Sequence, residues 1–531
     1  MIRDLAELEA AAGVTVEGAD VCIVGAGIAG LVLADRLRGQ GRRVVVLESG
    51  GRSHDERIHE LNWVVQQDQA HLGATDGRFR GLGGTSTRWG GQLLPLTADD
   101  LGPRPHVGLP PWPLAVRELE AHLPEIERLF AVDDGAYDGQ SGPRGLAGRL
   151  PVDDPDLALR FPKWPTFGRR NLVSLLRARI EGDPGLEIWL HATATGFEID
   201  RATGRVTGVG ARHLGGGQLL ARARHVVIAA GTIESTRLLL LLDAAHEGRV
   251  FAGCAALGRY FQDHFSAPVA RLAARDFRRL NRMFGQRFVG STMRSLRLEL
   301  RPAAQAAEAV SSAFGHVSAE AGDDSAFALL RDLLRERQER GRLRLRSVAQ
   351  LASQLPALAE TGLWRYGLKR LRWPPDARLH LRVDVEQLPH PDNRIMLSSE
   401  CDCLGQRRAM IAWRVRAAEH RTFGAYARRF TAFWRRHGLD EVARIDWLIA
   451  AEAPGERIAE LGRDTYHPTG STRMGQDRRD AVVDPDLRTH ALPNLWVASA
   501  SVLPSSGSAN PTLTLMLLAR RLGDRLASSQ P

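Results

Sequence analysis

The sequence has few cysteines and lacks any long apolar run. Its four cysteines are too few for a disulfide framework, and Cys401 and Cys403 lack the further ligands that a zinc site needs. We therefore expect no metal. No stretch approaches the roughly 18 uninterrupted apolar residues of a membrane-spanning helix. The N-terminus shows no basic and apolar signal pattern, which favours a cytoplasmic protein.

Lysine is also scarce, since Lys163 and Lys369 are the only lysines among 71 basic residues. The net charge is +9, and residues 331–372 account for an excess of seven positive charges. A basic protein can bind nucleic acid, but no recognisable nucleic-acid-binding module accompanies this charge. We therefore expect no nucleic-acid partner. A chain of 531 residues is long enough for two or more domains.

Residues 20–49 have the pattern of a βαβ nucleotide-binding unit. An apolar strand leads to Gly25, Gly27 and Gly30, an apolar helix follows, and a second apolar strand ends at Glu48. The glycines permit a tight turn, close approach to a pyrophosphate and close packing of helix on strand. The helix N-terminus attracts phosphate, and an acid about 20 residues further on accepts hydrogen bonds from ribose. The unit predicts a bound dinucleotide but does not distinguish FAD from NAD.

Three later segments add to this unit. Residues 81–96 (GLGGTSTRWGGQLLPL) are rich in glycine and small hydroxyl residues, which allows the backbone to approach a flat ring or a phosphate. Residues 225–237 (HVVIAAGTIESTR) predict a strand, a glycine turn and a helix. The C-terminal segment runs from HPTGSTRMG at His467 to SANPTLTLMLLA, where Asn510 and Pro511 precede a helix.

Taken in order, these segments and LGRYFQDH, which ends at His264, resemble the glucose–methanol–choline (GMC) oxidoreductase family. The resemblance covers residues 18–266 and 380–528. It implies an α/β fold, with an FAD-binding Rossmann-like domain interleaved with an α+β substrate domain built on an antiparallel sheet. We expect the FAD-binding domain at residues 18–266 and 460–531, with some substrate-domain segments inside it. We expect a helical basic insert or lid at 267–380 and the substrate domain at 381–459.

The resemblance also implies a chemistry. The family oxidises alcohols by hydride transfer to the flavin N5, and it places the catalytic base at His467 and its partner at Asn510. Neutral imidazole is a suitable base near neutral pH, and an amide can orient the substrate hydroxyl. His264 is interpreted as structural and His71 as an ordinary loop residue. The residues expected at the cofactor are Gly25, Gly27, Gly30, Glu48, Gly83, Gly84, Thr85, Trp89, Gly90, Gly91, Ala194, Gly231, Ala500, Pro511 and Thr512.

The sequence departs from the family at two positions. Some members attach FAD through a histidine in the glycine-rich loop, where this chain has Arg88, so non-covalent FAD is expected. Others have an aspartate before the C-terminal helix, where residues 498–501 read Ala-Ser-Ala-Ser. This change leaves open which groups hold that edge of the cofactor.

Several alternatives stay open at this point. A sugar or polyol is the favoured substrate, and oxygen, a quinone or a redox protein could accept the electrons. The family also includes hydroxynitrile lyases, and a non-catalytic flavoprotein is a further alternative. Residues 331–372 could form a substrate lid, a dock for a membrane surface or acidic partner, or a solvated basic insert.

Overall fold

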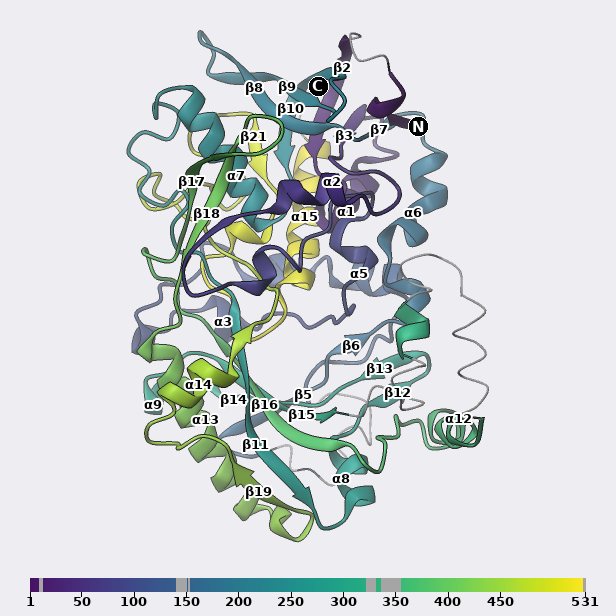
Figure 1. The fold of residues 1–531 in the computed structure, drawn as a ribbon, viewed down its shortest axis with the longest axis vertical. Helices are drawn as coiled ribbons and strands as arrows, with labels where there is room; N and C mark the ends of the chain where they lie inside the picture. Colours follow the sequence, from purple (N-terminus) through teal and green to yellow (C-terminus); the bar gives the residue numbers. More distant parts are fainter. Residues whose placement is uncertain (9–12, 140–149, 151–152, 321–330, 336–354, 529–531) are drawn as a thin grey trace.

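The computed structural model describes residues 1–531 except 9–12, 140–149, 151–152, 321–330, 336–354 and 529–531 (Figure 1). Two large sheets organise the chain. The first lies in the upper half of Figure 1. It joins N-terminal and C-terminal segments of the chain, because β2 (Gly13–Val24) and β21 (Leu495–Val497) both pair with β10 (Gln218–Ile228). The second lies in the lower half, so each half has its own hydrophobic core.

The first sheet has the order β1-β7-β3-β2-β10-β9-β8, with β21 beside β10. Its central strands run parallel, and β8 and β9 form an antiparallel extension. The parallel strands β2, β3, β10 and β21 end in buried apolar runs, as expected when helices cover both faces of a sheet. The strands are β1 (Ile2–Asp4), β2 (Gly13–Val24), β3 (Val44–Leu47), β7 (Leu186–Leu190), β8 (Thr193–Asp200), β9 (Arg205–Arg212), β10 (Gln218–Ile228) and β21 (Leu495–Val497).

Four helices pack around this sheet and confirm the predicted strand–helix units. Helix α1 follows β2 through the glycine loop, α7 follows β10, and α15 ends the chain against α1. The sequence pattern predicts a helix from Thr512 to Leu522, and α15 continues six residues further to Ser528, since buried Leu526 still packs in the core. The helices are α1 (Ile28–Leu37), α6 (Leu172–Glu181), α7 (Thr232–Ala245) and α15 (Pro511–Ser528).

The second sheet is antiparallel and has the order β19-β11-β16-β15-β14-β5, with β20 beside β11. One face is apolar and packs against the long helix α13 (Ala417–Arg436), whose Phe423, Tyr426 and Phe430 are fully buried. The other face is polar. The strands are β5 (Leu157–Arg160), β11 (His264–Ala274), β14 (Arg297–Leu300), β15 (Ala313–Glu320), β16 (Arg378–Glu386), β19 (Ala443–Trp447) and β20 (Arg463–Asp464).

The structure differs from the expected helical insert at residues 267–380. This segment supplies most of β11 and all of β12 to β15, because its apolar residues alternate at the period of a strand and are buried on one face. The short helices α8 (Phe277–Phe284), α9 (Pro302–Glu308) and α12 (Leu355–Gly362) also belong to it. The sequence pattern also predicts helices at residues 323–340 and 348–359. Most of the first, and residues 348–354 of the second, lie outside the described residues.

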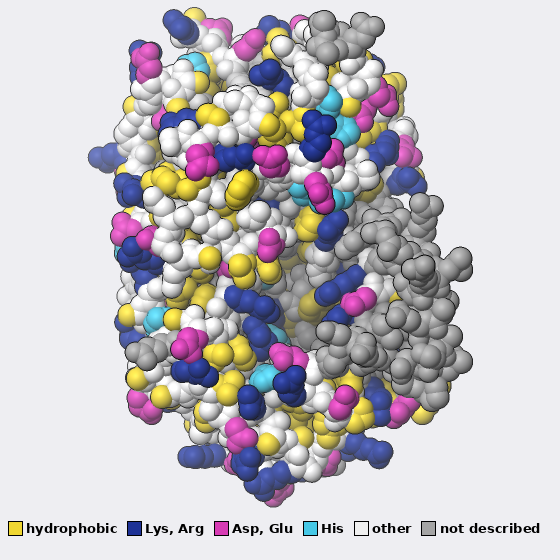
Figure 2. Space-filling view, in the orientation of Figure 1, with side chains coloured by type: hydrophobic (Ala, Val, Ile, Leu, Met, Phe, Trp, Pro, Cys, Tyr) yellow, Lys and Arg dark blue, Asp and Glu magenta, His cyan; other side chains and the backbone are white. Residues whose placement is uncertain are grey.

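Two small sheets complete the fold. One has the order β12-β13-β6 and the other β17-β18-β4. On the face drawn in Figure 2, basic and acidic side chains are interspersed rather than segregated. Within the described ranges, no helix combines the length and apolar character that a membrane crossing requires. The strands are β12 (Arg287–Val289), β13 (Thr292–Arg294), β6 (Lys163–Trp164), β17 (Arg394–Cys401), β18 (Arg407–Trp413) and β4 (Val65–Asp68).

Candidate functional site

A deep cavity opens where four parallel strands of the first sheet end. Gly25, Glu48, Ala229 and Ala498 each follow the last residue of a strand, and all four line it. Ligands of open α/β sheets bind at this carboxyl edge. The cavity volume is about 220 Å³. The N-terminal turns of α1, α7 and α15 also line it, so three helix dipoles favour an anionic ligand.

The three glycines of the first loop have different geometric roles. Gly25 has a φ of +107°, and a Cβ there would lie 2.7 Å from the Ala229 carbonyl oxygen. A Cβ at Gly30 would lie 1.9 Å from the Gly25 carbonyl oxygen, so only glycine lets the helix pack against the loop. A Cβ at Gly27 would meet nothing within 4 Å. Gly27 therefore keeps open the space that a pyrophosphate would occupy.

Glu48 is buried at the edge of the cavity. Its Oε1 accepts hydrogen bonds from the backbone amides of Gly50 and Gly81, both at 2.9 Å, and its Oε2 accepts one from Ala26 at 2.8 Å. Burial raises the pKa of Glu48, although these amides and Arg80 oppose the shift. Among the described residues, Oε2 accepts a hydrogen bond from Ala26 alone, and because a carboxylate oxygen can accept two, it can also accept a ribose hydroxyl.

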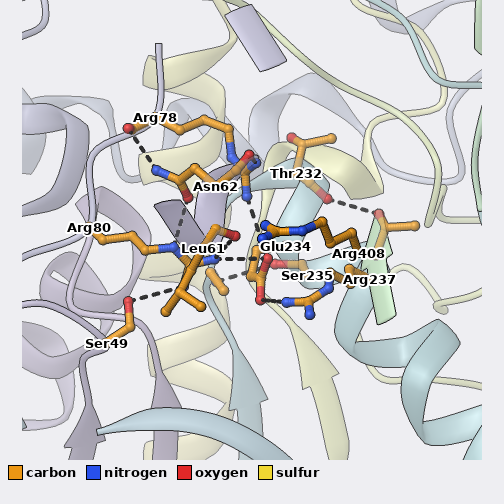
Figure 3. A network of polar contacts seen from close by, with 12 residues as sticks. Ser49, Leu61, Asn62, Arg78, Arg80, Thr232, Glu234, Ser235, Arg237 and Arg408 are labelled. Atoms are coloured by element: carbon orange, nitrogen blue, oxygen red, sulfur yellow. Dashed lines mark hydrogen bonds and ion pairs between the residues drawn. The ribbon is translucent and has the colours of Figure 1, made fainter. Parts of the chain in front are cut away.

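An arginine cluster forms another wall of the cavity (Figure 3). Arg78 and Arg80 both reach Glu234 of α7, with N–O distances of 3.4 and 3.0 Å, and Arg237 contacts the same carboxylate at 2.9 Å. Arg237 also pairs with Asp402. Although burial raises the pKa of Glu234, these arginines lower it to about 2.

This cluster has three guanidinium groups and two carboxylates, which leaves one positive charge in excess beside the cavity. A surplus of this sign suits a diphosphate. The sequence prediction missed Arg78, Phe79 and Arg80, although they directly precede the glycine-rich loop. Together with the open space at Gly27 and the free acceptor on Glu48, the cluster shows that the residues present fit FAD.

Not every residue predicted at the cofactor lines the cavity. Gly83 and Gly30 act through packing, since the Gly83 amide donates to the Ala26 carbonyl at 2.9 Å. Ala194 is buried in β8 away from the cavity wall. The predicted residues on the wall are Gly25, Gly27, Glu48, Gly84, Thr85, Gly231, Ala500, Pro511 and Thr512; those outside it are Gly30, Gly83, Trp89, Gly90, Gly91 and Ala194.

The two predicted catalytic residues meet at one end of this cavity. His467 lies on its wall, and Asn510 directly precedes α15. The Asn510 Nδ2 and the His467 Nε2 are 2.8 Å apart. Arg297 donates to the Asn510 Oδ1, which fixes the orientation of the amide, so Nδ2 is the group that donates to His467. The guanidinium of Arg297 lies over the Phe314 ring and also donates to Gln92.

The environment of His467 favours its neutral form. Burial, and to a smaller extent the neighbouring His264, lowers its pKa to about 4, although Asp263 and Asp384 oppose the shift. At neutral pH the imidazole is therefore unprotonated, and its Nε2 can accept a proton.

His71 is fully buried behind the His467 segment, contrary to its interpretation as an ordinary loop residue. Its Nε2 lies 3.1 Å from Asp263 and its Nδ1 3.8 Å from Asp464. Although burial opposes it, contact with these carboxylates raises the pKa of His71. These three residues could in principle ligate a metal. However, each ring nitrogen faces a different carboxylate, which suits a protonated imidazole between two anions better than a metal ligand.

The polar face of the second sheet lies next to the catalytic pair. Ser266 and Asp384 are directly paired on β11 and β16, and His316 and Arg382 are paired on β15 and β16. The Asp384 Oδ2 lies 3.4 Å from the His316 Nδ1. Although burial opposes it, His316, Ser266 and Arg297 hold the pKa of Asp384 well below its usual range. This face offers charged and hydroxyl groups to whatever reaches His467.

Comparison with known proteins identifies the family. The family model described as GMC oxidoreductase matches residues 389–519, which include His467 and Asn510. A second model, described as an NAD(P)-binding Rossmann-like domain, matches residues 23–73. The chain therefore matches the GMC oxidoreductase family over residues 389–519. It is an FAD-dependent oxidoreductase of the class that acts on CH–OH groups, as its sequence resemblance predicted.

Individual relatives agree with this assignment. The fructose dehydrogenase large subunit of Gluconobacter japonicus is 35% identical over 144 residues, which are 27% of this chain and 24% of that protein. Paromamine 6'-oxidase of Streptomyces fradiae is 25% identical, covering 96% of this chain and 91% of that protein. The solved structure of pyridoxine 4-oxidase from Mesorbium loti has a TM-score of 0.59 at 19% identity, covering 97% of this chain and 100% of that chain. This last likeness confirms the fold.

Proposed function

We propose that this GMC oxidoreductase oxidises a hydroxyl-bearing carbon of a sugar or polyol to an aldehyde or ketone, with His467 as the base. The observation that supports it most directly is the 2.8 Å contact between the His467 Nε2 and the Asn510 Nδ2 at the end of the cofactor cavity. A base and an amide donor on one substrate oxygen are what removal of its proton requires.

FAD, when bound, supplies the acceptor for the hydride that leaves the carbon. His467 takes the hydroxyl proton on Nε2, and Asn510 donates a hydrogen bond to the oxygen as negative charge develops there. Arg297 keeps the Asn510 amide in the orientation that permits this donation. The substrate oxygen would replace the direct contact between the two side chains.

The polar face of the second sheet supports the substrate class. Asp384, His316 and Arg382 present ionic and hydrogen-bonding groups where an apolar alcohol would leave them unpaired. A polyhydroxylated substrate satisfies them. The relatives named for fructose and paromamine also act on carbohydrate-like molecules, by their names.

Two further features concern the cofactor and its reoxidation. We propose that FAD is held non-covalently, because Arg88 lies over the Phe79 ring at 4.4 Å and a guanidinium cannot form the covalent link. Oxygen is the first electron acceptor to test, because two relatives that each match 96% of this chain, paromamine 6'-oxidase and 6'''-hydroxyparomomycin C oxidase, are named as oxidases.

The test is anaerobic reduction of the bound flavin by a panel of sugars, polyols and simple alcohols. We expect a polyol to bleach the flavin band, and His467→Ala to keep the colour but reduce at least a hundredfold more slowly. Asp384→Asn should raise the substrate concentration for half-maximal reduction several-fold. A hydroxynitrile-lyase-like or non-catalytic flavoprotein would show no bleaching with any alcohol, and an equal rate in His467→Ala would refute the base assignment.

A further inference from the structure

We infer that His264 and Thr465 are positioning residues that hold the His467 ring in the tautomer with a free lone pair on Nε2. The inference rests on the proposed role of His467 as the base. It changes the interpretation of His264 from a structural residue to one that acts through the catalytic ring. The two residues come from different elements, since His264 begins β11 and Thr465 directly follows β20.

The hydrogen-bond partners of His264 determine which of its nitrogens is protonated. Its Nε2 lies 2.8 Å from the Gly507 carbonyl oxygen. A carbonyl oxygen only accepts, so the Nε2 carries the hydrogen, and in the neutral ring the Nδ1 must then be an acceptor. This Nδ1 lies 3.2 Å from the Nδ1 of His467. His264 therefore offers His467 an acceptor.

Thr465 offers a second acceptor to the same atom. Its Oγ1 lies 3.2 Å from the Asp263 Oδ1 and 2.8 Å from the His467 Nδ1. A carboxylate only accepts, so the hydroxyl hydrogen points to Asp263 and the Oγ1 lone pairs face His467. Asp263 is fully buried, and although burial raises its pKa, contact with His71 lowers it overall, so it stays ionised.

Both neighbours of the His467 Nδ1 are thus acceptors, and this nitrogen must carry the hydrogen. In the neutral ring, the lone pair then lies on Nε2, 2.8 Å from the Asn510 amide and facing the cavity. The reverse tautomer would place a lone pair against two acceptors and a hydrogen against an amide donor. The Asp263 carboxylate also accepts hydrogen bonds from the His467 backbone amide, at 2.9 and 3.0 Å. The ring and the backbone of His467 are therefore held by two adjacent residues, His264 and Asp263.

The arrangement also assists the step after proton uptake. When the Nε2 takes the substrate proton, the ring becomes an imidazolium whose Nδ1–H still faces Thr465 and His264. The Asp263 carboxylate behind Thr465 stabilises the new positive charge. Thr465 and His264 therefore serve both protonation states, and neither needs to touch the substrate.

Matched variants separate this role from simple packing. His264→Asn keeps an acceptor near the Nδ1 position but loses the bond to Gly507, whereas His264→Gln keeps a donor toward Gly507 and loses the acceptor. Thr465→Val removes the acceptor at constant shape, and Thr465→Ser keeps it. Each variant is purified with FAD, and its flavin content and visible spectrum control for folding. Reduction by the best substrate is followed anaerobically from pH 3.5 to 8.

We expect His264→Gln and Thr465→Val each to slow reduction about tenfold, the effect of losing one hydrogen bond of ordinary strength. The double variant should lose about a hundredfold, while His264→Asn and Thr465→Ser stay within about threefold of the parent. The acid limb of the pH–rate profile should move to lower pH in Thr465→Val, because the His467 imidazolium loses an acceptor there. It should not move in Thr465→Ser, which keeps that acceptor.

Two results would overturn the inference. One is a double variant that reduces at the parental rate while His467→Ala is slow. The other is a slow His264→Asn variant beside a His264→Gln variant at the parental rate, which would show that the anchor on Gly507 matters rather than the acceptor. If His467→Ala itself reduces at the parental rate, the proposed function fails instead, so the two failures are distinguishable.

Discussion

The pH dependence of flavin reduction follows directly from the environment of His467. Burial and His264 lower its pKa to about 4, from an ordinary value near 6.5. At pH 5.5 a pKa of 4 leaves about 97% of the base neutral, whereas an unperturbed histidine would be about 9% neutral. The apparent second-order rate constant for reduction should therefore stay nearly constant from pH 7 to 5.5. It should fall only near pH 4.

The assay is anaerobic stopped-flow reduction of the flavin at limiting substrate, because kcat/KM-type constants report the ionisation of the free enzyme. A neutral polyol is used so that the substrate does not titrate. The rate constant falls as pH falls through the pKa of His467, because the base works only when it is unprotonated. An acid limb between pH 6 and 7, with about a tenfold loss by pH 5.5, would show that His467 is not desolvated as described, or is not the base.

Four further substitutions test the residues around the site. Gly30→Ala should destabilise the apoprotein by at least about 2 kcal/mol, because its Cβ would meet a carbonyl oxygen at 1.9 Å; Gly27→Ala should leave apoprotein melting unchanged but weaken FAD binding, measured by fluorescence titration. His71→Gln should lower the free energy of unfolding by roughly 3–5 kcal/mol at pH 5.5, measured by urea unfolding, because it leaves buried carboxylates unpaired. Because folding raises the pKa of His71, the stabilisation that His71 provides is present below pH 6.5 and shrinks as pH rises through its pKa in the folded protein. Arg297→Lys should slow flavin reduction about tenfold with little change in half-saturating substrate, because a single ammonium cannot hold both Gln92 and the Asn510 amide.

The sequence alone predicted the first sheet well, for a physical reason. A glycine loop between two buried strands leaves little conformational choice, and β2, α1 and β3 lie where residues 20–49 placed them. The second sheet was harder to predict. Polar and apolar residues alternate along its strands, but the strands pair across long separations in the sequence, as Leu157 of β5 does with Leu300 of β14. Nothing local in the sequence encodes such a pairing.

The site shows the same division. The pair of His467 and Asn510 was predicted from the resemblance, because each lies within a characteristic segment. Their partners were not. Arg297 comes from β14, inside the region expected to be a helical insert. His71 looked like an isolated loop histidine, and only the fold brings it to Asp263 and Asp464.

The arrangement explains why the base and its partner lie on different segments. Asn510 is held by Arg297 and through Gly507, whose amide donates to Glu386 and whose carbonyl accepts from His264. His264, Arg297 and Glu386 all lie on the polar face of the second sheet, whereas the segment from Gly507 to Asn510 leads into a helix of the first. The second sheet therefore sets the position of a residue that contacts His467 on the cavity wall. In the proposed function, a substrate bound against this polar face would contact the same strands that orient His467 and Asn510, so recognition of the substrate and alignment of the proposed base would depend on one surface.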